Sequence, residues 1–264
     1  MNSLKAMALA ITLVVSPAGA ARAGEAARYV LTIEEVGPSG RQATRTTFDL
    51  EGGDQRIAVI RAYAVQSGET WTDVAISEDC RRAFGSQGDE IGRVRVVPEQ
   101  ARIDDLAPAC APEPLFGAMT DLASFALIAY SPSFRAGELV EIGQTLPLAP
   151  FEAEWSRPPA LISAKLSSPG GEVRLVEASA DGRRVNWSPG PMPLMIRRAG
   201  PAGAEMTLEG VETIALEVDL VGGELVGGRS TVDQLDMTLK MPGLPPTGMP
   251  VAIVRSLTLK REVP

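Results

Sequence analysis

Apolar and polar side chains alternate along most of this chain, and this period of two constrains the fold more than any other feature. Segment 211–221 is the clearest case, because its aliphatic side chains share one face and its acidic side chains share the other. Successive side chains of a β-strand point to opposite faces of the sheet, so this alternation predicts half-buried strands. Such segments recur between Tyr29 and Arg261, separated by turns rich in glycine and proline. The pair Asp181-Gly182 is a strong hairpin signal.

These strands predict a mainly β fold, an antiparallel, twisted and curved sheet that is half-barrel- or sandwich-like. One stretch breaks the alternation and is apolar around most of a helical circumference. It predicts one long buried helix near residues 114–130, since Pro114 suits a first turn and Ser131-Pro132 ends the pattern. Such a helix needs burial on more than one side. We expect a core helix held in the curved sheet; the alternative is a mobile lid over an apolar cavity or a partner-binding helix.

The first residues have the layout of a secretory signal peptide. Lys5 precedes the uncharged apolar run 6–15, which is shorter than the about twenty residues that span a bilayer. Small residues at a spacing that suits cleavage follow. We expect residues 1–23 to be removed after Ala23, with cleavage after Ala20 as the alternative. The mature protein would then be periplasmic or extracellular, without an integral membrane span; an uncleaved anchor or a buried helix is the competing interpretation.

Residues 24–264 are expected to form a single β-rich domain, which is long enough to bury a substantial core. A division into two lobes, with its boundary between 131 and 159, is the alternative. Arginine outnumbers lysine and alanine is abundant, a composition that suits a bacterial genome of high GC content.

The chain contains no histidine. This excludes Ser-His-Asp and Cys-His catalysis, the common histidine-based zinc sites and imidazole pH switches. The two cysteines, Cys80 and Cys110, predict a disulfide in an exported protein. We expect no catalytic residues, no metal and no cofactor. The remaining catalytic alternative is a histidine-independent hydrolase, in which Ser163 and Lys165 share one face of a strand.

The formal net charge of −8 at pH 7 disfavours nucleic acid as a partner, because an acidic surface repels phosphate groups. The stretch 223–230 resembles a phosphate-binding loop, with Arg229 in place of the usual lysine. A true phosphate loop leads into a helix, whereas segment 231–240 alternates as a strand does. We therefore expect the glycines to allow positive φ at a turn between two antiparallel strands.

Six large apolar side chains are candidates for lining an apolar ligand site: Trp71, Met119, Phe125, Phe134, Phe151 and Trp155. Met119 and Phe125 belong to the predicted helix. The alternative is that each aromatic residue anchors its own strand in the core.

These features predict an exported, non-catalytic bacterial cell-envelope protein that holds an apolar or amphiphilic ligand between sheet and helix. An exported sheet curled around a helix is similar in outline to the half-barrel envelope proteins that carry lipoproteins or lipids in bacteria, although no motif is shared. The partner would be a lipid, another apolar ligand or an envelope protein. The alternative function is a structural or protein–protein interaction module of the envelope.

Overall fold

The computed structural model describes residues 27–37, 40–51, 56–74, 90–97, 100–104, 139–157, 162–180, 182–199, 205–221, 224–249 and 253–262. Within these ranges sixteen strands form one sheet, and every pairing except β6–β8 is antiparallel. The prediction of a mainly antiparallel β fold is confirmed. The described ranges contain no helix, and the helix predicted near 114–130 lies outside them, as does the predicted signal peptide.

The sixteen strands have the following bounds: β1 (Ala27–Gly37), β2 (Gly40–Glu51), β3 (Arg56–Ser67), β4 (Thr70–Asp73), β5 (Gly92–Val97), β6 (Gln100–Asp104), β7 (Thr145–Leu148), β8 (Phe151–Arg157), β9 (Ile162–Ser168), β10 (Gly171–Ala178), β11 (Arg183–Trp187), β12 (Pro191–Ala199), β13 (Glu205–Val221), β14 (Glu224–Lys240), β15 (Thr247–Met249) and β16 (Ile253–Arg261).

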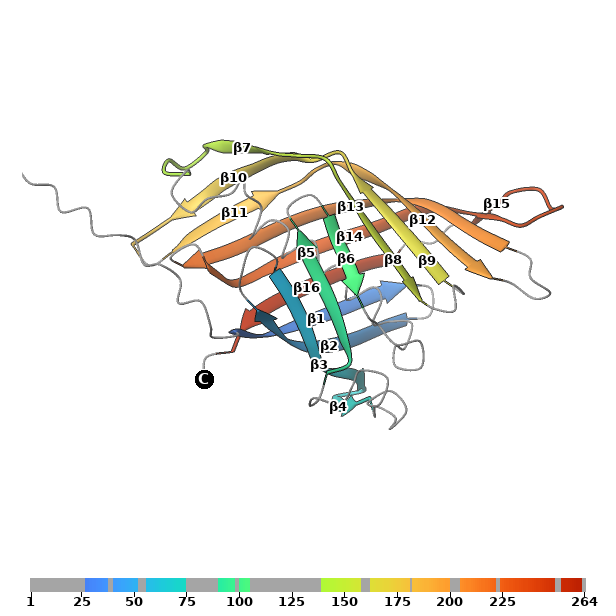
Figure 1. Ribbon diagram of the computed structural model, residues 1–264, viewed down its shortest axis with the longest axis horizontal. Helices are drawn as coiled ribbons and strands as arrows, with labels where there is room; N and C mark the ends of the chain where they lie inside the picture. The colour runs from blue at the N-terminus through green and yellow to red at the C-terminus, as the bar shows by residue number, and fades with distance from the viewer. Residues whose placement is uncertain are drawn as a thin grey trace, which may run out of the picture.

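The long hairpin of β13 and β14 is the centre of the sheet (Figure 1). One edge of β13 pairs with β12 over residues 205–213 and with β11 over 216–220, while its other edge pairs with β14. The far edge of β14 pairs with β16 over 227–234 and with β15 over 237–239. From β16 the order continues through β1, β2, β3, β5, β6, β8 and β9 to β12. Strands from both sides of the segment 131–159 therefore belong to one curled sheet.

Buried apolar side chains form one cluster. We call the side of the sheet that carries this cluster the inner face. Tyr29 and Phe48 stack there with ring centroids 5.4 Å apart, and Tyr29 donates a hydrogen bond to the backbone oxygen of Leu225 at 2.5 Å. β13 contributes alternate residues to the inner face, ending in Ile214, Leu216, Val218 and Leu220, each at most 3% exposed. Full burial of such a side chain stabilises the fold by about 1.5–3 kcal/mol. The alternation in the sequence therefore sets which face of each strand joins the core.

The turn before β10 is fixed by a glycine and a tryptophan. Gly170 has φ of +86°, and a Cβ atom at this position would lie 2.3 Å from the backbone oxygen of Leu148. The indole nitrogen of Trp187, a residue that is 1% exposed, donates a hydrogen bond of 3.1 Å to the Gly170 carbonyl. Only glycine satisfies both the backbone conformation and the close approach.

We expect Gly170→Ala to lower the free energy of unfolding by roughly 1–3 kcal/mol, because the alanine would combine a strained φ with a backbone clash. Gly248→Ala is the matched control, since Gly248 has open space around its Cα and no positive φ. Urea unfolding followed by tryptophan fluorescence measures both variants. Equal stability of the two variants would contradict the role given to Gly170.

Candidate functional site

Several polar residues interrupt the apolar inner face, including Ser230, which pairs with Leu216 and Leu257. We call five of them the inner-rim cluster: Glu35, Thr46, Tyr63, Glu212 and Arg255. Strand register pairs Glu35 with Arg255 and Thr46 with Tyr63, and Thr46 also pairs with Leu31, four residues along β1 from Glu35. Directly paired residues of an antiparallel sheet point to the same face. The cluster thus consists of a charged group from β1, β13 and β16 and a pair of hydroxyl residues from β2 and β3 that lies deeper, at the level of Leu31.

The charged part of the cluster is a buried ion pair. Arg255 reaches across β14 and places Nη2 2.7 Å from Oε1 of Glu212, with 11% and 4% of the two side chains exposed. Burial raises the pKa of the Glu212 carboxyl, and the charge of Arg255 and its hydrogen bond oppose that increase. Desolvation of two charges costs several kcal/mol per ion, and mutual attraction offsets it only in good geometry. The pair therefore adds little stability over the aliphatic residues that could pack at these positions.

The hydroxyl part of the cluster has hydrogen-bonding capacity that the described residues leave unused. Thr46 is 1% exposed and Tyr63 is 3% exposed, and the Thr46 hydroxyl has no hydrogen-bond partner in the described part of the structure. Burial raises the pKa of Tyr63 to about 12, a side-chain hydrogen bond with Thr44 opposes the increase, and the charge of Glu35 adds to it. The phenol is thus neutral at physiological pH. Buried hydroxyls without a hydrogen-bond partner are rare in proteins.

The cluster supports binding better than catalysis. It combines one arginine, two carboxylates and two neutral hydroxyls, without an imidazole or a thiol that would activate a nucleophile. Among the described residues no group of three carboxylate, cysteine or histidine side chains could hold a metal ion. No helix in the described ranges is long and apolar enough to cross a membrane.

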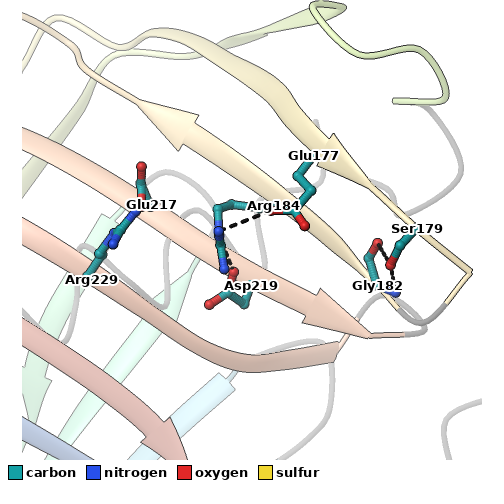
Figure 2. A network of polar contacts seen from close by, with 7 residues as sticks. All are labelled: Glu177, Ser179, Gly182, Arg184, Glu217, Asp219 and Arg229. Carbon is teal, nitrogen blue, oxygen red and sulfur yellow. Dashed lines mark hydrogen bonds and ion pairs between the residues drawn. The ribbon is translucent and has the colours of Figure 1, made fainter.

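The outer face carries a second set of polar contacts (Figure 2). Arg184 of β11 bonds to Asp219 of β13 at 2.6 Å and to Glu177 of β10 at 3.0 Å. Arg229 of β14 pairs with Glu217 of β13. These side chains are 28–69% exposed, so each pair contributes little to stability. This network links the strands of a solvated face.

The stretch that resembles a phosphate loop lies within the β13–β14 hairpin. β14 begins at Glu224 and stays extended through Lys240, so no helix follows the glycines. Arg229, which replaces the motif lysine, pairs with Glu217 on the outer face. The predicted antiparallel strands are confirmed, and the turn between them, for which the positive φ was expected, lies outside the described residues. Gly227 permits close packing, since a Cβ there would lie 3.2 Å from the backbone oxygen of Leu259.

The Asp181-Gly182 hairpin is also found, between β10 and β11. Ser179 Oγ accepts a hydrogen bond from the Gly182 amide at 3.1 Å and donates one to its carbonyl at 3.2 Å (Figure 2).

The structure places three of the six predicted lining residues. Trp71 lies in β4 and pairs with Gln66, on the face opposite Tyr63, where the Arg45 guanidinium is 4.8 Å from the ring centroid. Phe151 and Trp155 belong to β8, where the backbone pairs with β9. Trp71 is thus apart from the inner-rim cluster. The other three, Met119, Phe125 and Phe134, lie outside the described residues, as do Cys80 and Cys110.

The Ser163–Lys165 arrangement lies on the outer face. Leu166, the residue after Lys165, points inward and is 1% exposed, so Ser163 and Lys165 point to the opposite face. Lys165 Nζ pairs with Glu152 at 2.8 Å, with 37% of the lysine side chain exposed. An exposed, paired lysine on a solvated face lacks the dry pocket that would make it a base, so this geometry does not favour the hydrolase.

Comparison of the chain with protein-family models, with curated proteins and with solved structures finds no match. The interpretation of function therefore depends on the geometry of the inner face.

Our sequence analysis missed the inner-rim cluster, although the sequence contains a signal for it. Glu212 lies on the same alternation phase as Ile214, Glu35 on that of Ile33, and Arg255 on that of Leu257. A charged residue on the apolar phase of an alternating strand is unusual, because that phase faces the core. Three such residues on three strands mark an inward-facing polar site.

We expect Arg255→Leu to lower the free energy of unfolding by about 3–5 kcal/mol, because it leaves the Glu212 carboxylate buried without its partner. The double change Arg255→Leu/Glu212→Leu should recover most of that loss. Lys240→Leu is the matched control, since its pair with Glu209 is 47% and 40% exposed and should contribute less than about 1 kcal/mol. Urea unfolding of the four proteins tests this; equal losses for Arg255→Leu and Lys240→Leu would refute the buried pair.

Proposed function

We propose that this chain is an exported, non-catalytic cell-envelope protein that binds an amphiphilic ligand at the inner face of its curved sheet. The observation that supports this function is the division of the inner face. One continuous apolar cluster meets charged and hydroxyl side chains at the inner-rim cluster. An amphiphile has the same division, and ligand sites commonly combine an apolar lining with a few placed polar groups.

The exposure of apolar side chains along the inner face supports entry of the ligand near Ile253 and Val65. Leu31 and Leu257, deep in the sheet, are completely buried, whereas Ile253 and Val65 near the cluster are half-buried. Apolar side chains that keep some exposure beside polar groups offer surface to an incoming alkyl chain. In this proposal the predicted helix near 114–130 covers the ligand from the other side. The N-terminal signal-peptide pattern supports export.

A matched pair of rim variants tests ligand binding. Ile253 lies on the inner face beside the cluster, and its neighbour Val254 lies on the outer face with 45% of its surface exposed. With dodecyl maltoside as the probe, we expect Ile253→Asn to weaken binding by about tenfold or more, since burial of such a side chain is worth about 1.5–3 kcal/mol. Val254→Asn should bind as the wild type does.

Isothermal titration below the critical micelle concentration measures the affinities, and thermal unfolding checks that both variants fold. Native mass spectrometry of the exported protein should also show a bound lipid. Absence of both lipid and probe binding in the wild type would reject the amphiphile function.

A second candidate function, a protein–protein interaction module, is favoured by one ordered turn. Val140 and Ile142 are 63% and 68% exposed, next to Leu139, which is 1% exposed. The amides of Val140 and Glu141 donate to Gln144 Oε1 at 2.8 and 3.3 Å, and the Gly143 amide donates to the Leu175 carbonyl at 2.8 Å. The turn therefore exposes two aliphatic side chains on a hydrogen-bonded backbone. Such an exposed apolar surface suits contact with a partner protein.

If this second function holds, Val140→Ser/Ile142→Ser should abolish a complex with an envelope protein while the fold stays unchanged. Val36→Ser/Val254→Ser is the control, because these two aliphatic residues are also exposed, at 54% and 45%, and pair on the outer face. Light scattering of the purified complex gives its stoichiometry. A complex that survives the turn variant, or none in the wild type, would count against the interaction module.

A further inference from the structure

An arginine lies at the end of the inner face opposite the inner-rim cluster. Arg183, the first residue of β11, pairs across the strands with Leu220 of β13, and directly paired residues of an antiparallel sheet point to the same face. Leu220 is 3% exposed and belongs to the apolar cluster, so the half-buried Arg183 points inward. Glu212 lies eight residues before Leu220 on β13, which is about 27 Å at about 3.4 Å per residue. Arg183 is therefore separate from the inner-rim cluster.

Arg183 lacks a counter-charge within the part of the chain that the structure describes. Its Nη1 atom is buried and donates no hydrogen bond there, and its side chain forms no ion pair. The other two described arginines of the inner face do form ion pairs. Arg255 pairs with Glu212, and Arg261 Nη1 lies 2.9 Å from a carboxylate oxygen of Glu224. A half-buried charge without a partner lowers stability, so the inward guanidinium of Arg183 requires a reason beyond packing.

The residues beside Arg183 are apolar. On one side lies Leu220, and Val185, the next inward residue of β11, is fully buried. On the other side Arg183 pairs across the strands with Ala178, which is exposed. Solvent therefore reaches the inner face on this side of the guanidinium. A ligand at Arg183 would meet one positive charge and an apolar surface.

We infer that Arg183 is the anchor of a binding site for an alkyl carboxylate. The two oxygens of a carboxylate accept parallel hydrogen bonds from one guanidinium, and its single negative charge balances the unpaired positive charge. A phosphate has more charge and more oxygen atoms than one guanidinium with apolar neighbours can satisfy. The alkyl chain lies along the edge of the apolar cluster, beside Ala178 and Leu220. This site goes beyond the proposed function, because it lies at the other end of the inner face and recognises an anion.

The next residue of β11 offers a matched control for the role of charge. Arg184 points to the outer face, where it contacts Asp219 at 2.6 Å and Glu177 at 3.0 Å (Figure 2). Arg183→Gln and Arg184→Gln change the net charge of the protein equally. Only Arg183→Gln removes the inward guanidinium, and the loss of the exposed pairs of Arg184 should change stability little.

The test measures octanoate binding to the full exported protein by isothermal titration, with octylammonium and acetate as references. We expect the wild type to bind octanoate at least about tenfold more tightly than either reference, because octylammonium has the wrong charge and acetate lacks the alkyl chain. Arg183→Gln should weaken octanoate binding by about tenfold or more, the range for a lost hydrogen bond to a charged group. Arg184→Gln should leave it unchanged. Arg183→Lys should recover only part of the affinity, since lysine keeps the charge but loses the paired donors.

Stability measurements distinguish a binding role of Arg183 from a structural one. Without octanoate, Arg183→Gln should unfold at the same urea concentration as the wild type or at a higher one, because it removes a charge that has no partner. Octanoate should raise the melting temperature of the wild type and of Arg184→Gln, but not that of Arg183→Gln. A clear loss of stability in Arg183→Gln without octanoate would overturn the inference.

The remaining outcomes separate this inference from the proposed function. Dodecyl maltoside should bind Arg183→Gln as it binds the wild type. Octanoate binding that is absent from the wild type, or equal in the wild type and Arg183→Gln, would overturn the carboxylate site and leave the amphiphile function standing. Octanoate binding as expected, without any binding of dodecyl maltoside or lipid, would reject the amphiphile function and keep the carboxylate site. Equal affinities for acetate and octanoate would overturn the alkyl part of the ligand.

Discussion

The β13–β14 hairpin is the constraint on which the rest of the sheet depends. Fourteen residue pairs join its two strands, and its outer edges hold β11, β12, β15 and β16 in place. A slip of one residue in this hairpin would turn Glu217 and Asp219 into the core and expose Leu216 and Val218. The apolar phase of one strand pair thus fixes which side of the entire sheet becomes the inner face.

The same ionic chemistry has different consequences on the two faces of this hairpin. Arg229 and Glu217 meet on the outer face, where water screens the pair and its loss changes little. Arg255 and Glu212 meet on the inner face, where each would be strongly destabilising without the other. A buried pair of this kind adds little net stability over aliphatic packing. Its presence on the apolar phase of two strands is therefore not explained by stability alone.

Much of the fold could be predicted from the sequence because the strand signal is local. Alternation along 211–221 and the Asp181-Gly182 turn each depend on neighbouring residues, and both are found as β13 and the β10–β11 hairpin. The order of the strands depends on contacts between distant segments, and the parallel β6–β8 pairing has no local signal. The positive φ expected at the turn of the glycine-rich stretch stays a prediction, because the turn between Val221 and Glu224 lies outside the described residues. The close approach of Gly227 to β16 depends on a neighbouring strand that the sequence does not place beside it.

The site was harder to predict than the fold, because it consists of exceptions to the pattern that predicts the fold. Glu35, Glu212 and Arg255 each appear as a polar residue on the apolar phase of a strand, and only the register of four strands shows that they lie near one another. Aromatic residues were a poor guide, since Trp71 stacks with Arg45 on the outer face. In a sheet protein without histidine, the polar residues that fall on the buried phase are more informative about binding than the large apolar ones. Apolar residues on that phase are required by the core in any case, whereas a buried charge or an unpartnered hydroxyl requires a reason beyond packing.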